Sequence, residues 1–555
     1  MEQSTSTIVQ SENPETRGNI VAVFVVHFDV HRGNVIEWQY PEDFDLKGVE
    51  YQAICSGLHR IENDIIYFSR DNGYGISVFQ NMPTDVERGA YMKSIGVIVQ
   101  PTQDTGICGQ VWNHQVFLQQ ELQNHMIISD TIESDRYEQL LQYYTHHQYR
   151  SPDNTTKHNI IPDLVSHEIS LDHTVNYNLK YNLQTMKQST EFSTNSFTNL
   201  INKFGPDIFV LWKAALLRKK IMITHMPPME IGCHYVYLIH LLGQIPAKFQ
   251  SSIQNILPKF TMGVNDIPQL EKIRSSYVAC TPDSIFQIKS DLYDILVTLP
   301  APSFHHTIKG TTTNKKSTQH IALSDLSYHQ QPHFKSTVIS TKHNSADFTR
   351  FRIMCKLFHT GSFVAKNEPN DILSTASALL TGICYWLYEE NEEIKPTRSN
   401  WEGLFAGSQR QKQITLNQSS ETDLLLMEEE QDAEELNNNA VFDAVVARAS
   451  TDVQQENETK EQNQALLSFF HNLTYFLLEK LQSVLSENEE DGIGLVPIYP
   501  KDMVHMGLDP QADAAFVTEL AQLYFKKRVQ VFSWKHMGHI SQCSNCCCSK
   551  QSIHI

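Results

Sequence analysis

The chain is 555 residues long, which at ~100–200 residues per domain predicts about three to five structural units. Hydrophobic residues make up 41% of it and charged residues 19%, a composition typical of a folded chain rather than a disordered or coiled-coil one. The net charge of −19 argues against general binding to nucleic acid or to anionic lipid. We therefore expect a folded, multi-lobed protein that meets any basic partner surface locally.

The N-terminal residues 1–19 are polar and lack the charged start and apolar run of a signal peptide. We expect them to form a disordered tail. Because the cysteines are thinly spread up to a bunch between residues 543 and 548, reduced thiols in the cytoplasm are expected. The longest apolar stretches, Ile20–Phe28 and Tyr235–Gly243, are shorter than the ~20 residues that cross a bilayer. Any attachment to endomembranes is therefore expected to be peripheral.

Residues 20–130 predict an α+β unit. β-rich runs and apolar residues at helical spacing alternate in the order strand, strand, helix, three strands, helix. The expected strands are Ile20–Phe28, Asn34–Tyr40, Asp64–Ser69, Tyr74–Gln80 and Ser94–Gln100, and the expected helices are Val49–Leu58 and a segment with Val111, Leu118, Leu122 and Met126 on one face. This order favours an antiparallel sheet with helices packed on it, as in a longin-type unit.

Residues 131–204 are expected to be a connector with a polar insertion, and residues 205–299 a central α/β lobe. Pro206 stands at a first helical position, Lys220–Thr224 is a strand and Ile231–Leu242 a helix. Thr281-Pro-Asp283 has the cap, first-turn proline and carboxylate that open a helix. The apolar face expected for that helix comprises Ile285, Ile288, Leu292 and Ile295.

Residues 300–344 are dominated by Thr, Ser, His, Lys and Gln, and are expected to be a flexible linker. Residues 345–535 predict a mainly helical downstream lobe, interrupted by an acidic insertion at 410–464. Its helical stripes are Ile372, Ala376, Leu379, Ile383 and Leu387, then Leu466, Phe469, Phe470, Leu473, Leu477 and Leu481, then Phe516, Val517, Leu520 and Leu523. Val529–Phe532 is expected to close this lobe as a strand, before a Cys-rich tail at 536–555.

No sequence motif for covalent catalysis is found. The chain lacks the nucleophile elbow, the Walker phosphate loop, the dinucleotide-binding glycine pattern and the zincin helix motif. The pairs His146-His147 and His305-His306 lie in polar surroundings, which favours solvated loop histidines over metal ligands. We therefore assign no catalytic residue, no metal site and no cofactor.

The C-terminal tail has three interpretations. His536, His539, Cys543 and Cys546 are a possible zinc set, but they lie too close together to wrap an ion comfortably. Reversible acylation of Cys546, Cys547 and Cys548 is the second interpretation. An unstructured tail with reduced thiols is the favoured one.

Five segments resemble the LCHN branch of the DENN-domain proteins. They are Ile36–Asp43, Val86–Gly96, Phe204–Lys220, Tyr277–Asp283 and Lys289–Asp294. The resemblance runs from about Asn19 to about Trp534, and from Gly507 onward the chain is similar to the domain of unknown function attached to this branch. It implies a longin-like upstream lobe, a central α/β lobe and a helical downstream lobe.

The resemblance also implies a function. DENN-domain proteins commonly act as guanine nucleotide exchange factors for Rab GTPases in membrane traffic, and exchange needs no covalent step. The alternatives are a trafficking scaffold or adaptor without exchange activity and, less favoured, a GTPase-activating module. The activating module needs an exposed arginine finger, for which Arg88 is the first candidate. The sequence does not identify the GTPase or the oligomeric state.

Candidate GTPase contacts come from the matching segments at the junction of the first two lobes. Glu37, Glu42 and Asp43 are candidates to meet basic groups, and Arg88 and Lys93 to meet acidic ones. Each of these also fits ordinary surface charge near turns, and Trp38 is more typical of a core. Further candidates, each with a structural interpretation at a helix end, are Arg218, Lys219, Lys220 and Asp283.

Overall fold

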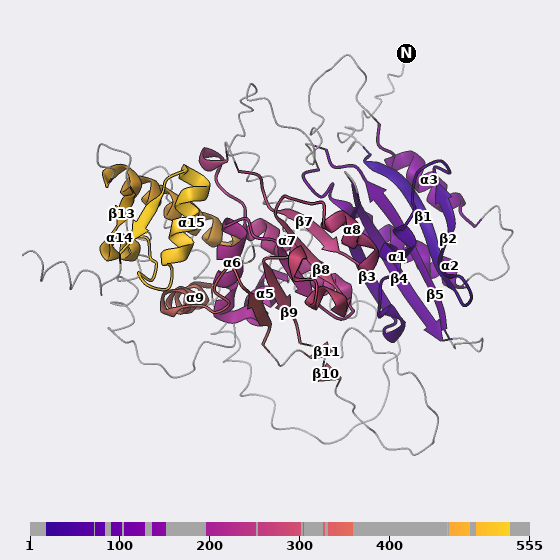
Figure 1. Ribbon diagram of the computed structural model, residues 1–555. Helices are drawn as coiled ribbons and strands as arrows, with labels where there is room; N and C mark the ends of the chain where they lie inside the picture. The colour runs from indigo at the N-terminus through magenta and orange to yellow at the C-terminus, as the bar shows by residue number, and fades with distance from the viewer. Residues whose placement is uncertain are drawn as a thin grey trace, which may run out of the picture.

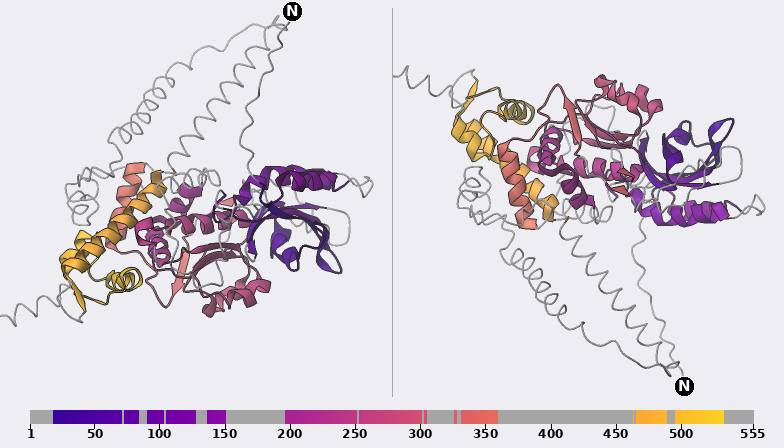
Figure 2. Two further views of the ribbon diagram at one scale, coloured as in Figure 1. Left: turned by 90° about the horizontal axis from the view of Figure 1, so that it is seen from above. Right: turned by 90° about the horizontal axis from the view of Figure 1, so that it is seen from below.

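The computed structural model shows three lobes in a row, upstream, central and downstream (Figure 1). Views from above and below keep the same order (Figure 2). The residues that the structure describes are 18–70, 73–83, 90–102, 105–127, 136–150, 196–250, 253–300, 303–304, 326–327, 331–358, 463, 465–488 and 495–532.

The upstream lobe contains the expected antiparallel sheet. Its strands are β1 (Ile20–Asp29), β2 (Gly33–Tyr40), β3 (Asn63–Arg70), β4 (Gly73–Pro83) and β5 (Ala90–Val99). They lie in the order β3-β4-β5-β1-β2, and every neighbouring pair is antiparallel. Gly33 ends the β1–β2 turn with φ +80°, a left-handed conformation that favours glycine. The prediction of five strands in an α+β unit is therefore confirmed.

Helices cover both faces of this sheet. Short α1 (Val49–Ala53), followed by the 3-10 turn η1 (Leu58–Arg60), contacts β2 to β5. On the other face lie η2 (Val111–His114), α2 (Gln115–Ile127) and α3 (Glu138–His147) (Figure 2). The sequence places α3 in a connector, but it belongs to the lobe. The polar composition of α3 gives little sign of a buried helix in the sequence. Its contacts with β2 are made by aromatic side chains, Tyr144 and the N-cap residue Tyr137.

The central lobe extends the same sheet with parallel strands. These are β6 (Ile221–Thr224), β7 (Leu257–Thr261), β8 (Tyr277–Thr281) and β9 (Ile295–Thr298). In the described part of the chain one sheet of ten strands runs β12-β9-β6-β8-β7-β3-β4-β5-β1-β2. The two lobes join where β3 pairs with β7 at Phe68 and Phe260.

The linker expected at 300–344 includes folded structure. β12 (His333–Ser336) pairs antiparallel with β9 and forms one edge of the sheet, and its Phe334 contacts Phe204. The short strands β10 (Ser303–Phe304) and β11 (Leu326–Ser327) pair with each other. The assignment of residues 331–344 to a linker is wrong because tertiary pairing, rather than local apolar content, holds β12 in place.

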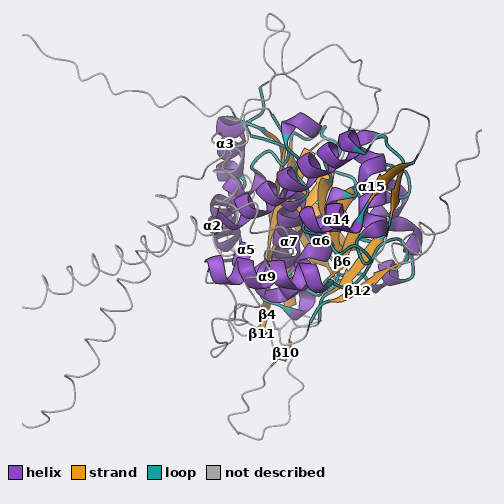
Figure 3. Ribbon diagram, turned by 90° about the vertical axis from the view of Figure 1, so that its left-hand side faces the viewer, coloured by secondary structure: helices purple, strands orange, loops and turns teal. Residues whose placement is uncertain are grey.

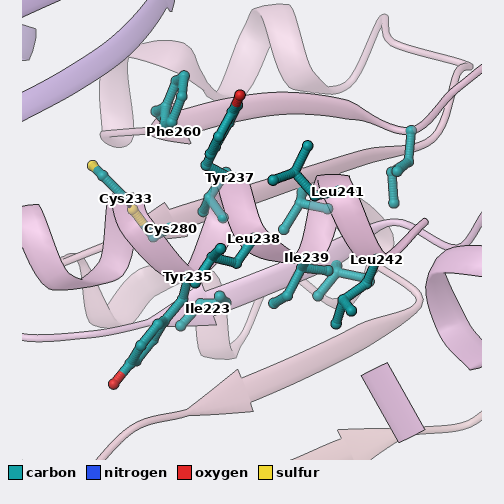
Figure 4. Packing of buried hydrophobic residues seen from close by; sticks show 14 of the residues in the cluster. Ile223, Cys233, Tyr235, Tyr237, Leu238, Ile239, Leu241, Leu242, Phe260 and Cys280 are labelled. Atoms are coloured by element: carbon teal, nitrogen blue, oxygen red, sulfur yellow. Dashed lines mark hydrogen bonds between the residues drawn. The ribbon is translucent and has the colours of Figure 1, made fainter. Parts of the chain in front are cut away.

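One face of the central sheet is covered by apolar helices. They are α5 (Ser196–Phe204), η3 (Gly205–Asp207), α6 (Ile208–Leu216) and α7 (Met229–Leu242), with η4 (Ala247–Phe249) beyond. Helix α7 contacts β3, β7 and β8, and its side chains interlock with Phe260 and Cys280 (Figure 4). The opposite face carries a second apolar cluster under η5 (Val264–Asp266) and α8 (Ile267–Leu270).

The helix expected after Thr281-Pro-Asp283 does not form. The chain makes two 3-10 turns, η6 (Ser284–Gln287) and η7 (Ser290–Leu292), and then enters β9 at Ile295. Ile288, expected on a buried face, is 79% exposed. The helix-start signal is present, but the expected helical face does not persist, because Ile295 pairs with Ile221 of β6 as a sheet residue.

The downstream lobe is mainly helical, as expected, and faces the viewer in Figure 3. It comprises α9 (Ser345–Phe358), a helix at residues 465–487, α14 (Pro500–His505) and α15 (Ala514–Phe525). Strands β13 (Val496–Ile498) and β14 (Val529–Val531) pair in parallel, which confirms the closing strand. The stripe from Leu466 to Leu481 is buried. The stripe from Ile372 to Leu387 and, apart from Asn463, the acidic insertion lie outside the described residues.

Buried polar contacts join the downstream and central lobes. Trp212 on α6 donates its indole N–H to Thr474 Oγ1 at 2.9 Å, and both side chains are fully buried. Lys213 Nζ lies 2.7 Å from both Asp347 Oδ2 and Asp513 Oδ1. Because these partners are far apart in sequence, the contacts fix how the two lobes sit on each other. Within the described residues, no helix is both long enough and apolar enough to cross a membrane.

A groove at the junction of the upstream and central lobes

A groove of about 270 Å³ lies where the upstream lobe meets the central lobe. The upstream wall is built by the β1–β2 hairpin, by α1 and by the loop that follows α1, and the central wall by the turns after β7 and β8. The lining residues are Phe28, Asn34, Tyr51, Ile54, Cys55, Ser56, Gly57, Leu58, His59, Met92, Gly263, Val264, Asn265, Asp266 and Asp283.

Backbone contacts hold the upstream wall in place. Asn34 donates its side-chain N–H groups to the carbonyls of Glu50 (3.1 Å) and Ile54 (2.8 Å), which ties α1 to β2. Gly57 has φ +89°, and a Cβ at this position would lie 3.2 Å from Pro227 of the central lobe. The upstream wall is therefore seated directly on the chain that leads into α7.

The central wall presents two carboxylates that converge near Gly263. Asp266 Oδ2 accepts the backbone N–H of Gly263 at 2.7 Å, and Asp283 Oδ2 accepts that of Val264 at 3.1 Å. Gln52 Nε2 crosses from α1 to donate to Asp266 Oδ1 at 3.0 Å. Burial is the main cause that raises the pKa of Asp266, and the nearby Asp283 adds to it. Negative charge is therefore concentrated, and incompletely neutralised, on this wall.

Apolar side chains line the rim of the groove. Tyr51 is 49% exposed and Val264 is 52% exposed, so one apolar side chain stands on each wall. Ile285, just beyond Asp283, is also exposed. Exposed apolar surface beside half-buried carboxylates is typical of a protein-binding surface.

Asp64, a buried carboxylate on β3, connects the two lobes. Asp64 on β3 accepts the backbone N–H groups of Met229 (2.7 Å) and Glu230 (3.2 Å) at the start of α7. It satisfies N–H groups that the first turn of a helix leaves without partners. Burial raises the pKa of Asp64 to about 7, although these N–H groups act to lower it.

This carboxylate predicts a pH-dependent contribution to stability. Because the folded pKa lies above the ordinary value of 3.8, the contribution is complete below that value and is lost as pH rises through about 7. We expect the difference in unfolding free energy between wild type and Asp64→Asn to fall between pH 4 and pH 7. Urea denaturation at stepped pH measures it, with the exposed Asp45→Asn as control. A difference in unfolding free energy that does not change with pH would contradict the raised pKa of Asp64.

Two of the sequence-predicted contacts, Glu37 and Lys93, are engaged with each other. Lys93 Nζ donates to Glu37 Oε1 at 2.8 Å, and the Lys93 side chain has no exposed surface. Tyr137 OH donates to the same oxygen at 2.6 Å, and His27 lies 3.2 Å from the other. This cluster lies under α3 and not in the groove. Both residues are therefore structural, which corrects their assignment as GTPase contacts.

Glu42 and Asp43 are exposed in the turn that follows β2, so they remain available to a partner. Neither lines the groove. Trp38, half-buried, stacks on Tyr137 at 4.8 Å, which agrees with a packing role. Arg88 and the candidate acylation sites Cys546, Cys547 and Cys548 lie outside the described residues.

The basic residues after α6 have structural partners. Arg218 has φ +56° and donates Nη1 to the carbonyls of Ala215 and Gly243, at 2.7 Å each, so it caps two helix ends. Lys219 pairs with Glu519, and Lys220 Nζ donates to the carbonyl of Ile273 at 2.7 Å. The structure supports the helix-end interpretation for Arg218, gives Lys219 and Lys220 other partners, and places none of the three in the groove.

Of the predicted site residues that the structure describes, Asp283 is the one that lies in the groove. Sequence reasoning missed Gln52, Tyr51, Val264 and Asp266. Asn265-Asp266 after an apolar run was a usable turn signal for the central wall. Nothing in the local sequence connects it to Gln52, which is 214 residues away.

Comparison with known proteins gives two family matches. Residues 23–309 match the family described as DENN domain-containing protein 11, and residues 479–543 match a domain of unknown function, DUF4484. All the groove residues lie within the first match.

Curated relatives share part of their length with this chain. DENN domain-containing protein 11 of Rattus norvegicus is 32% identical over 290 residues, 52% of this chain and 59% of the rat protein. The Danio rerio protein is 33% identical over 296 residues, 51% of this chain and 54% of its own. Uncharacterized protein ANR2 of Saccharomyces cerevisiae is 25% identical over 328 residues, 54% of this chain and 60% of its own. The chain thus spans under two thirds of these relatives and, by its match over residues 23–309, belongs to the DENN domain-containing protein 11 family.

Proposed function

We propose that this chain promotes GDP release from a Rab-type small GTPase in membrane trafficking. DENN-domain proteins are generally exchange factors for Rab GTPases, and this chain belongs to a DENN family. The observation that carries the proposal is the groove at the junction of the two lobes, which lies entirely within the matched segment.

Exchange imposes a requirement on this surface. An exchange factor binds the nucleotide-free GTPase more tightly than the GDP-bound form, and linkage makes GDP binding weaker by the same factor. Each tenfold preference needs about 1.4 kcal/mol of differential binding. Several contacts must therefore act together. The groove has exposed apolar side chains and two carboxylates, and both lobes contribute residues to it. We propose Glu42 and Asp43 as further contacts at the edge of this surface.

A nucleotide-release assay tests the proposal. Full-length protein is added to a panel of Rab proteins loaded with fluorescent GDP, and we expect faster release from at least one of them. Val264→Glu is expected to lower that rate at least tenfold, because it places a charge on the apolar rim.

The matched control is Val338→Glu, since Val338 is 53% exposed and lies outside the groove, against 52% for Val264. We expect this change to leave the rate unaltered. Binding without faster release would favour the adaptor function, and faster GTP hydrolysis would favour the activating module. If no Rab protein released GDP faster, the exchange function would be refuted.

A further inference from the structure

The central wall of the groove presents two carboxylates as hydrogen-bond acceptors. Asp266 and Asp283 supply two carboxylates, with backbone N–H groups and Gln52 Nε2 as their hydrogen-bond partners. Gln52 itself is buried on α1 and does not line the groove. Two half-buried carboxylates on the wall of a groove favour a guest that brings donors.

The residues that line the groove carry no cation to satisfy these acceptors. They include neither lysine nor arginine, and Asp266 and Asp283 are the acidic residues among them. The nearby Lys289 pairs with Glu271 at 3.3 Å on the surface, and Arg70 lies 3.9 Å from Asp45. Arg70 lowers the pKa of Asp266 only as a minor influence beside burial. The charge of the groove is therefore complementary to a positive guest.

The apolar surroundings fit the rest of such a guest. Lysine and arginine side chains place a long aliphatic stem against apolar surface while the charged head finds acceptors. Tyr51 and Val264 border the groove from opposite walls, and the exposed tyrosine ring also attracts a cation. An apolar rim with acceptors on the wall matches that combination.

We propose that this groove binds a lysine or arginine side chain of the partner GTPase, with Asp266 and Asp283 as its acceptors. This inference rests on the proposed function for the identity of the partner, and adds the chemistry that the partner must present. Asp283 is the best residue to test, because Asp266 accepts hydrogen bonds from both Gly263 N–H and Gln52 Nε2, whereas Asp283 accepts that of Val264 N–H.

The test compares full-length wild type with Asp283→Asn in two assays on the Rab panel, GDP release and binding to the nucleotide-free form. Glu487→Gln is the matched control, since it removes the same charge at an exposed site in the downstream lobe. We expect Asp283→Asn to reduce kcat/KM for release, or the binding affinity, at least tenfold with an unchanged melting temperature. The wild-type rate is expected to fall with added salt, and the variant rate to depend less on salt.

The client is then scanned by replacing its surface lysines and arginines with alanine in both backgrounds. We expect one replacement to weaken wild type strongly and to have no further effect on Asp283→Asn, which is the mark of a direct pair. If wild type and Asp283→Asn accelerate GDP release equally, the binding of a basic side chain in the groove is refuted and the exchange function is retained. If binding depends on Asp283 without faster release, exchange is refuted and the inference is supported. If wild type neither binds nor accelerates any Rab protein, both are refuted.

Discussion

Replacing Lys213 with methionine is expected to lower the free energy of unfolding by about 3–5 kcal/mol. Lys213 Nζ bridges Asp347 and Asp513 at 2.7 Å each, and these carboxylate side chains are 1% and 4% exposed. Burial acts to raise the pKa of Asp513, but Lys213 and Arg350 together hold it below its ordinary value. Without Lys213, two buried carboxylates would share only the guanidinium of Arg350, which already pairs with Asp347 at 2.8 Å.

Chemical denaturation measures this loss, and Lys248→Met is the control. Lys248 pairs with Glu479 at 3.4 Å, but the two side chains are 51% and 41% exposed, so that pair contributes under about 1 kcal/mol. Equal, small effects of the two replacements would show that the Lys213 cluster does not hold the downstream lobe against the central one.

Glu37→Gln is expected to destabilise the upstream lobe by about 3 kcal/mol, the second large effect. The replacement leaves the fully buried Lys93 without its anion and weakens the contact that holds Tyr137 and α3 on the sheet. A GTPase contact on the surface would instead change activity and leave stability unaltered. The control is Glu42→Gln, five residues along the chain at an exposed turn, with an expected change within about 0.5 kcal/mol.

The contribution of Glu37 to stability is also expected to depend on pH. Burial acts to raise the pKa of Glu37, but hydrogen bonds from His27, Lys93 and Tyr137 hold it well below its ordinary value of 4.5. Its contribution is therefore present above pH 4.5 and is lost as pH falls further. The stability difference between wild type and Glu37→Gln should shrink below pH 4.5, the opposite direction to Asp64. A difference that grew on acidification would exclude the ion pair as its source.

Segments whose apolar pattern is strong and local could be predicted from the sequence. β1 and α7 are apolar over most of their length, and both form where expected because burial of such a run is favourable in almost any packing. The apolar stripe from Leu466 to Leu481 has regular helical spacing and also forms a buried helix where expected. These segments were enough to predict the order of the lobes and, with the DENN-like segments, the family.

Segments with weak local patterns were decided by contacts between distant residues. α3 has few aliphatic residues, and it forms on the sheet because Tyr137 meets Trp38 and Glu37. β12 is a polar tetrapeptide that becomes a strand because β9 offers a free edge. The helix-start signal at Thr281-Pro-Asp283 failed for the same reason, since β6 required Ile295 as a paired strand residue.

The sequence by itself determined that the chain has an antiparallel sheet with helices, a central α/β lobe, a helical downstream lobe and no motif for covalent catalysis. Only the tertiary structure decided which charged residues are buried and which are accessible. Glu37 and Lys93, indistinguishable in sequence from surface charges, are buried against each other because their strands pair with β1 in adjacent positions. Asp266 meets Gln52 of α1, and lines a groove together with Asp283, because β3 joins β7 and brings the two lobes together. The type of each charged residue can be read from the sequence, but the accessibility of its side chain depends on long-range packing.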